Sequence, residues 1–168
     1  ARAGPMTRPR SRRSATANER RALMNQVIES ADRLQGRCLC GGVALSVPGD
    51  AHVVHACHCG ACRRWHGGPA MVLQAGGDLR IETGDALVRR FASSEWAERA
   101  FCNACGSSLF FLSTGDGQHY VAAGLFDAIP GAHFEAEIFI DAKPDWYTLD
   151  GPDEHLTGEA FFARIGAG

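Results

Sequence analysis

Residues 57–62 read C-H-C-G-A-C, and residues 63–68 continue R-R-W-H-G-G. Three cysteines in a C-x-C-x2-C pattern can direct their sulfurs at one metal ion from a single tight loop, because Gly60 lets the backbone curl beneath the ion. Three thiolate ligands leave one position of a tetrahedral zinc ion open. Cys57, Cys59 and Cys62 therefore predict a zinc site that can bind a fourth, exchangeable ligand.

The other four cysteines form two short pairs, Cys38 with Cys40 and Cys102 with Cys105, and a glycine follows each pair. A glycine with positive φ after the second cysteine lets backbone N–H groups face the sulfurs, which is the geometry of a zinc knuckle. Two knuckles predict one closed, structural zinc site. Because 61 residues separate Cys40 from Cys102, the ion would join distant parts of the chain, and we expect the fold to depend on it.

Two alternatives remain beside this assignment. A disulfide framework is disfavoured, because seven is an odd number of cysteines and an i,i+2 pair is poorly placed for an unstrained bridge. The three-cysteine site is closed rather than open if His55, His58 or His66 supplies a fourth ligand.

Length and charge indicate two different parts of the chain. The 168 residues, 45% of them hydrophobic, suit one domain over residues 36–168. Residues 1–37 carry nine arginines and three acidic groups, so residues 1–35 read as a basic extension, disordered or partly helical. Residues 38–168 carry eight basic and sixteen acidic groups, which argues against nucleic acid as a partner. No apolar run is long enough for a membrane partner, and the cysteine clusters favour a cytoplasmic location.

The hydrophobic pattern predicts a mainly β domain. Residues 18–34 have helical spacing, and from residue 36 onward the period changes to two, with Pro, Gly and Asp at the corners. Residues 158–165 predict a closing helical turn. The expected strands are 43–47, 52–56, 70–74, 79–82, 87–92, 96–101, 108–112, 119–123 and 135–140.

Five motifs resemble one known family. They are G-x-C-x-C-G-G at 36–42, C-x-C-x2-C-R-R at 57–64, F-C-x-x-C-G-S-x-L-F at 101–110, A-A-G-x-F-D at 122–127 and I-F-I-D-x-K-P-D-W-Y at 138–147. The sequence is similar to the glutathione-dependent formaldehyde-activating (GFA) family, which includes the centromere protein V relatives. The resemblance covers about residues 36–161.

The resemblance implies a β-tent of short antiparallel strands with two zinc ions. It implies a structural zinc on Cys38, Cys40, Cys102 and Cys105, and a catalytic zinc on Cys57, Cys59 and Cys62. The implied reaction joins glutathione and formaldehyde to S-hydroxymethylglutathione, which is formally a carbon–sulfur lyase reaction run in reverse.

Side chains beside the three cysteines suggest further roles. His58 and His66 are candidates for proton transfer, because an unperturbed imidazole titrates near neutral pH. Arg63, with Arg64, could bind substrate carboxylates. The pattern fits equally well two arginines that lie on the surface and are solvated. Trp65 and Phe126 could line a pocket, but aromatic residues of a small β domain are more often core.

Two other functions stay open from the sequence. One is a binding or scaffold module held together by zinc without chemistry, since a fold does not determine a function. The other is a zinc lyase or hydrolase that acts on a different small thiol adduct. A protein ligand at the fourth position of the three-cysteine site favours the scaffold, and an exchangeable position favours the enzyme.

Overall fold

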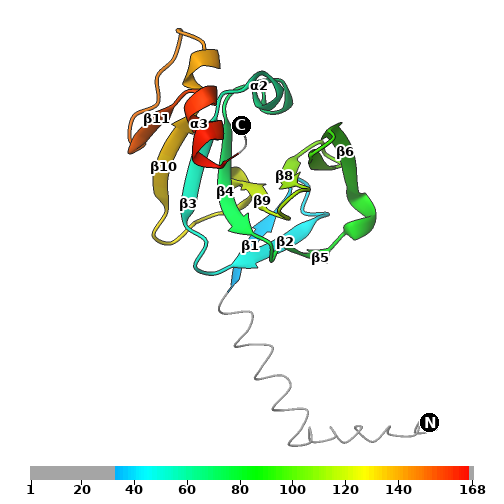
Figure 1. The fold of residues 1–168 in the computed structure, drawn as a ribbon. Helices are drawn as coiled ribbons and strands as arrows, with labels where there is room; N and C mark the ends of the chain where they lie inside the picture. The colour runs from blue at the N-terminus through cyan, green and yellow to red at the C-terminus, as the bar shows by residue number, and fades with distance from the viewer. Residues whose placement is uncertain (1–32, 167–168) are drawn as a thin grey trace, which may run out of the picture. The chain divides into compact units, whose positions relative to one another are not determined.

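The computed structural model describes residues 33–166, which form two β-sheets, two short helices and three 3-10 turns (Figure 1). One sheet has the strand order β1-β2-β5, and the other has the order β11-β10-β3-β4-β9-β8-β7-β6. No helix in this part of the chain has the length and hydrophobicity of a membrane span. The elements are β1 (Arg33–Arg37), β2 (Ala44–Pro48), β3 (Val53–Cys57), α2 (Gly60–His66), β4 (Ala70–Gly76), β5 (Arg80–Thr83), η1 (Asp85–Leu87), β6 (Val88–Ser94), β7 (Ala97–Cys102), β8 (Ser108–Ser113), β9 (His119–Ala122), η2 (Ala123–Leu125), β10 (His133–Ile138), η3 (Ile140–Ala142), β11 (Glu154–Leu156) and α3 (Gly158–Arg164).

The mainly β fold is confirmed. All nine predicted strands are present, with ends displaced by at most two residues, and the closing helical turn is α3. The pattern did not predict β1, β11 or α2. Residues 18–32 of the predicted N-terminal helix lie outside the described residues. Its last two positions, Arg33 and Leu34, are instead in β1, where Leu34 pairs with Val47 of β2.

The strands are not all antiparallel as the resemblance implied. β10 pairs in parallel with β3 and with β11, whereas every other pairing in the two sheets is antiparallel. Parallel neighbours need a connection that returns the chain to the same end of the sheet. Residues 139–153 provide that return between β10 and β11, and they carry η3 on the way.

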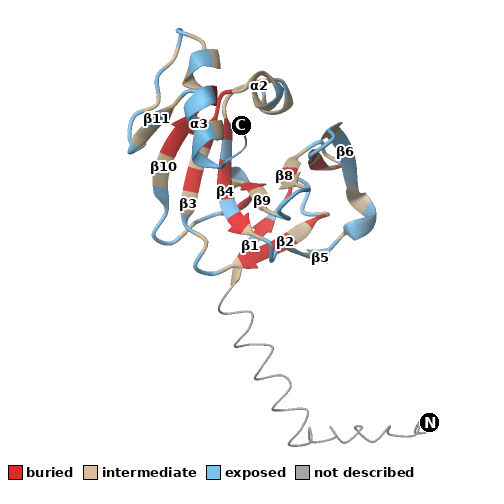
Figure 2. Ribbon diagram, in the orientation of Figure 1, coloured by how far each residue is buried: buried red, intermediate tan, exposed pale blue. Residues whose placement is uncertain are grey.

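Two groups of buried apolar residues support the sheets. The larger group includes Leu45 and Val47 of β2, Leu73 of β4, and Phe110 and Val121 of β8 and β9, so it joins both sheets. The smaller group consists of Cys57, Ala70, Val72, Ala136 and Ile138, with Phe139 and Phe161 packed against it. Buried positions lie mainly on β2, β3, β4, β7 and β10, and those on β3, β4 and β10 are seen in Figure 2. The smaller group leads directly to the end of β3, where the three-cysteine stretch begins.

Both cysteine pairs form the predicted turn. Gly41 has a φ of 71° and Gly106 has a φ of 75°, a region that glycine adopts without steric cost. In each turn the first cysteine donates its N–H to the carbonyl five residues later, at 3.0 Å from Cys38 to Val43 and 2.9 Å from Cys102 to Ser107. The same local geometry therefore occurs twice, at the end of β1 and at the end of β7.

The first of these turns is held from outside by Gly84, which lies between β5 and η1. A Cβ atom at Gly84 would lie 1.9 Å from the carbonyl oxygen of Gly42, and the φ of Gly84 is 76°. Backbone thus packs directly on backbone here. The contact connects the three-stranded sheet to the cysteine turn.

Replacement of Gly84 by alanine should destabilise the domain more than the same change at Gly117. Gly117 has a similar φ of 71°, but a Cβ atom there would have no neighbour within 4 Å, so Gly117→Ala measures the cost of the positive φ alone. We expect about 1–2 kcal/mol for Gly117→Ala and at least roughly twice as much for Gly84→Ala, from urea unfolding. Equal losses in the two variants would show that the Gly84–Gly42 contact adds nothing.

Candidate active site

The first group of thiols joins the turn after β1 to the turn after β7. The sulfur atoms of Cys38, Cys40, Cys102 and Cys105 all lie within 4.8 Å of one another. Cys38 Sγ lies 3.5 Å from Cys40 Sγ, and Cys40 Sγ lies 3.9 Å from Cys102 Sγ. The Val43 N–H donates to Cys38 Sγ at 3.2 Å. Four converging sulfurs are the donor set of a closed tetrahedral metal site.

The second group lies where β3 ends and α2 begins. Cys57 is the last residue of β3, Cys59 precedes α2, and Cys62 is in its first turn, with all three sulfurs within 4.8 Å of one another. The Cys62 N–H donates to Cys59 Sγ at 3.4 Å, so a sulfur caps the helix where an oxygen usually does. Within residues 33–166 no histidine or carboxylate joins this group. The predicted division of the cysteines into four and three is confirmed.

The backbone turns at Gly60 without a left-handed residue. Gly60 is the first residue of α2 and is not among the residues with positive φ. The chain turns by starting a helix at once. Gly67, with a φ of 74°, ends that helix seven residues later.

Crowding of the sulfurs separates the pKa values of their thiols. Hydrogen bonds from Cys57 and Cys62 lower the pKa of Cys59 to about 2, and the contact with Cys59 raises the pKa of Cys57. In the first group, hydrogen bonds from Ser107 lower the pKa of Cys105 to about 5. Each group therefore holds a thiolate at neutral pH, the form of cysteine that binds metal ions.

His58 lies between two of these cysteines in the sequence, but its side chain is fully buried. Its Nδ1 lies 2.7 Å from the Tyr147 hydroxyl, and its Nε2 lies 3.0 Å from Glu137 Oε1. The His58 N–H donates to the Ile138 carbonyl at 3.0 Å, which continues the parallel pairing of β3 with β10. Both ring nitrogens are thus engaged, and the imidazole anchors the cysteine loop to β10.

Glu137 is the buried centre of a polar cluster that extends to the surface, which we call the Glu137 network: His58, Glu137, Lys143, Tyr147 and His155. Only 1% of Glu137 is exposed, and Lys143 Nζ lies 2.6 Å from its Oε1 while His155 Nδ1 lies 2.8 Å from its Oε2. Burial alone would raise the pKa of Glu137, but hydrogen bonds from Lys143 and His155 outweigh it and lower the pKa below 4.5. The network therefore contains a buried carboxylate that stays ionised at neutral pH.

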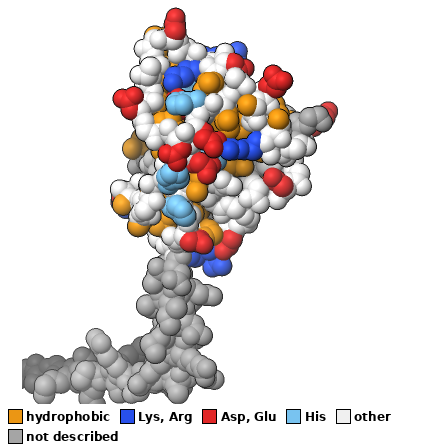
Figure 3. Space-filling view, turned by 60° about the vertical axis from the view of Figure 1, so that its left-hand side comes forward, with side chains coloured by type: hydrophobic (Ala, Val, Ile, Leu, Met, Phe, Trp, Pro, Cys, Tyr) orange, Lys and Arg blue, Asp and Glu red, His pale blue; other side chains and the backbone are white. Residues whose placement is uncertain are grey.

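More exposed pairs of histidine and carboxylate groups accompany this network. His55 Nε2 lies 2.7 Å from Glu135 Oε2, and His133 Nε2 lies 2.9 Å from Asp153 Oδ2. Figure 3, which brings forward the side that carries β10 and β11, shows histidine and acidic side chains close together on this surface. His55 is therefore paired with an acid instead of joining the three cysteines.

The three residues predicted to be catalytic have different partners. Arg63 donates from Nε to the His58 carbonyl at 3.0 Å, which links these two residues. His66 is one helical turn after Cys62. Burial and the positive charge of Arg99 lower the pKa of His66, so its imidazole is neutral at pH 7. Arg64 is exposed and donates from Nη1 to the Gly60 carbonyl at 3.0 Å.

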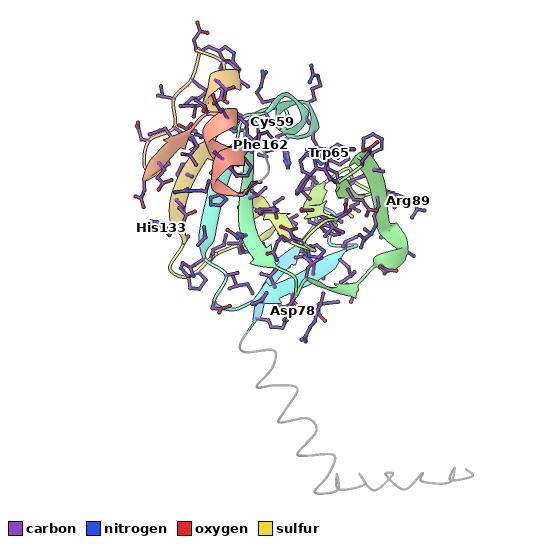
Figure 4. The ribbon with its side chains drawn as sticks, viewed as in Figure 1. Cys59, Trp65, Asp78, Arg89, His133 and Phe162 are labelled. Carbon is purple, nitrogen blue, oxygen red and sulfur yellow. The ribbon has the colours of Figure 1, made fainter. Side chains whose placement is uncertain are left out.

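The two aromatic candidates have structural contacts. Trp65 projects from α2 toward β6 and β8 (Figure 4), where its ring packs with Phe91 and Phe101 at centroid distances of 6.2 and 5.8 Å. Its Nε1 donates to Ser108 Oγ at 2.9 Å. Phe126 is buried in the larger apolar group. Trp65 thus holds α2, and with it Cys62, against the strands that follow.

Sequence reasoning missed one residue at the three-cysteine group. Arg99 of β7 is 7% exposed, and its Nη2 lies 3.7 Å from Cys62 Sγ. The sequence did indicate an inward position for Arg99. Residues two positions apart in a strand lie on the same face, so Arg99 shares its face of β7 with the buried Ala97. An arginine at an inward position of a strand needs a specific partner. Glu137 gave no such signal, because its neighbour Glu135 fits the same strand pattern.

The Glu137 network predicts unequal effects for two glutamates of one strand. Glu137→Gln should lower the free energy of unfolding by about 3 kcal/mol, because it leaves Lys143, whose side chain is only 16% exposed, without its counter-charge. Glu135→Gln, which affects a more exposed pair with His55, should cost less than about 1 kcal/mol. Urea unfolding at pH 7 measures both.

The same comparison can be followed with pH. Because the pKa of Glu137 is lowered in the folded protein, its contribution is present above pH 4.5 and is lost as the pH falls through the folded value. The difference between wild type and Glu137→Gln should shrink below that pH. A difference that stays constant would mean that the carboxylate charge is not what stabilises the network.

Comparisons with known proteins identify the family of this chain. A protein of Schizosaccharomyces pombe, named as an uncharacterized lyase, is 35% identical over 132 residues, which are 78% of this chain and 96% of the relative. A Rhodobacter sphaeroides crystal structure from a structural genomics programme is 24% identical with a TM-score of 0.49, covering 57% of this chain and 90% of that one. The model of the glutathione-dependent formaldehyde-activating enzyme family matches residues 33–142, a range that contains all seven cysteines. The chain belongs to the GFA family.

Proposed function

We propose that this protein is a zinc-dependent carbon–sulfur lyase-type enzyme that joins a small thiol, glutathione, to formaldehyde, or runs the reverse reaction. The observation that carries the proposal is the contrast between the two cysteine groups. One offers four sulfurs, and the other offers three with no histidine or carboxylate added within residues 33–166. Closed sites are structural, and a site with three protein ligands keeps a position for substrate.

The family and the yeast relative support a glutathione-related, lyase-type function. We assign a structural zinc to the four-cysteine group and a catalytic zinc to the three-cysteine group, because clustered sulfurs with lowered thiol pKa values suit this ion. When bound, the catalytic ion supplies a Lewis acid that favours the thiolate form of the substrate. We also propose a cytoplasmic location, since reduced cysteine clusters are typical of that compartment.

The proton of the substrate thiol must move to the carbonyl oxygen of the aldehyde as the carbon–sulfur bond forms. We assign this transfer to His66, because its lowered pKa keeps the imidazole neutral and able to accept a proton at pH 7. His66 lies four residues after Cys62 in α2, so both residues lie on the same side of the helix. In the reverse reaction, the imidazole takes the hydroxyl proton and returns it to sulfur.

The remaining two predicted residues receive different roles. Arg63 uses Nε for the His58 carbonyl, and we propose that its terminal nitrogens bind a carboxylate of the substrate. For His58 we propose a positioning role in place of proton transfer. Both of its ring nitrogens are committed to Tyr147 and Glu137, so the ring holds the cysteine loop and has no free nitrogen for a substrate.

Zinc content tests the assignment of the metals. Freshly purified protein should contain two zinc ions per chain, Cys59→Ser should contain one, and Cys59→Ser should keep a cooperative thermal transition. Cys105→Ser should lose that transition, because the four-cysteine group joins turns far apart in the chain. One zinc in both wild type and Cys59→Ser would contradict the catalytic site.

Turnover tests the reaction and the roles of the side chains. The rate of S-hydroxymethylglutathione formation, measured by NMR above the uncatalysed rate, should fall at least roughly a hundredfold in kcat for His66→Gln. Arg63→Gln should raise KM for glutathione by about tenfold with less effect on kcat. The exposed neighbour Arg64→Gln serves as the matched control. No acceleration by wild-type protein that contains two zinc ions would reject glutathione and formaldehyde as the substrates.

A further inference from the structure

We infer that Arg99 is the positive charge of the three-cysteine centre and sets the affinity of its open position for an anionic ligand. The inference rests on the proposed function in that the centre holds a metal ion with an exchangeable position. It adds a positioning residue from β7 that no motif of the sequence indicated.

Because Arg99 is buried, the groups that contact its guanidinium must replace the water that would otherwise solvate its charge. Its side chain is almost inaccessible, and its described contacts are the Ser93 hydroxyl, Cys62 Sγ at 3.7 Å and the face of the Phe111 ring at 5.2 Å from the centroid. None of these partners is a carboxylate. The other buried charges differ, since Arg33 has Asp78 at 2.5 Å and Glu137 has Lys143 at 2.6 Å.

A buried guanidinium without a counter-charge is unfavourable, because burial removes its hydration. Among the described contacts of Arg99, the thiol of Cys62 is the group that can carry a full negative charge, and its sulfur lies within 4.8 Å of the sulfurs of Cys57 and Cys59. Three thiolates around a divalent ion leave one net negative charge. Arg99 brings the centre to neutrality and removes the repulsion that an incoming anion would otherwise meet.

The charge of Arg99 acts on the side of the three-cysteine loop that carries Cys62 and His66. Arg99 contacts the side of α2 that carries Cys62, and its charge also acts on His66, the proposed proton carrier. The Ser93 hydroxyl and the Phe111 ring hold the guanidinium in place without neutralising it. On the opposite side, His58 and Glu137 form a network that already contains its own cation, Lys143. Arg99 is therefore a buried cation available to a ligand of the centre, in addition to Arg63, which we assign to a substrate carboxylate.

The test uses full-length protein in which cobalt(II) replaces zinc, so that ligand binding can be followed in the visible spectrum. The probes are glutathione and thiocyanate, which remains an anion at every pH used. Arg99→Met removes the charge at similar length, and Arg99→Lys keeps the charge without the planar fork. Arg89→Met is the matched control, because Arg89 lies in β6 and points away from the domain into solvent (Figure 4).

Arg99→Met should weaken binding of thiocyanate at least roughly tenfold, while Arg99→Lys keeps most of the affinity and Arg89→Met matches wild type. Equal thiocyanate affinity in wild type and Arg99→Met would overturn the inference, and so would a wild-type spectrum that responds to neither probe. A response to thiocyanate that depends on Arg99, with no response to glutathione, would support the inference and reject the proposed substrate.

If Arg99→Met does not fold, Arg99→Gln replaces it, because glutamine removes the charge and can still hydrogen-bond Ser93. A thiocyanate affinity clearly below that of Arg99→Lys, by about tenfold, supports the inference, and an affinity equal to that of Arg99→Lys overturns it.

Discussion

The described domain depends on the approach of two tight turns that are far apart in the chain. Cys40 and Cys102 are 62 positions apart, yet their sulfurs lie 3.9 Å from each other. Closing a loop of that length costs conformational entropy, which the sheets must offset by burial or the sulfurs by binding an ion. The glycine after each cysteine pair makes the approach possible, and Gly84 allows the three-stranded sheet to pack on the first turn without a side chain between them.

The three-cysteine loop lies inside the segment that these turns close, between the Glu137 network and the buried Arg99. The Glu137 network holds His58 from one side, and Arg99 contacts Cys62 from the other. The network has a balanced charge because Lys143 pairs with Glu137, so it acts mainly to position the loop. Arg99 has no carboxylate among its described contacts, so its charge is available to the thiol centre. This asymmetry gives the loop one structural side and one side suited to chemistry.

Much of the fold could be predicted because the strands are short and most of them alternate between apolar and polar residues. Turn residues marked nearly every corner, so nine strands were located to within two residues. β1 was missed because helical spacing continued through Leu34, and pairing with β2 overrides that local preference. The parallel partners of β10 were missed because pairing direction depends on the path of the chain between strands.

For the site, cysteine spacing was sufficient to separate the four-cysteine group from the three-cysteine group, because neighbouring thiols within a turn can reach only one centre. Spacing also marked His58, Arg63 and His66 as neighbours of the thiols, but it could not say which way each side chain points. That depends on contacts with residues 137 to 155 and with β7, which the fold brings to the loop from far along the chain. Local ligand geometry is encoded in short segments, whereas the charge around the ligands comes from pairings that exist only after the sheets have formed.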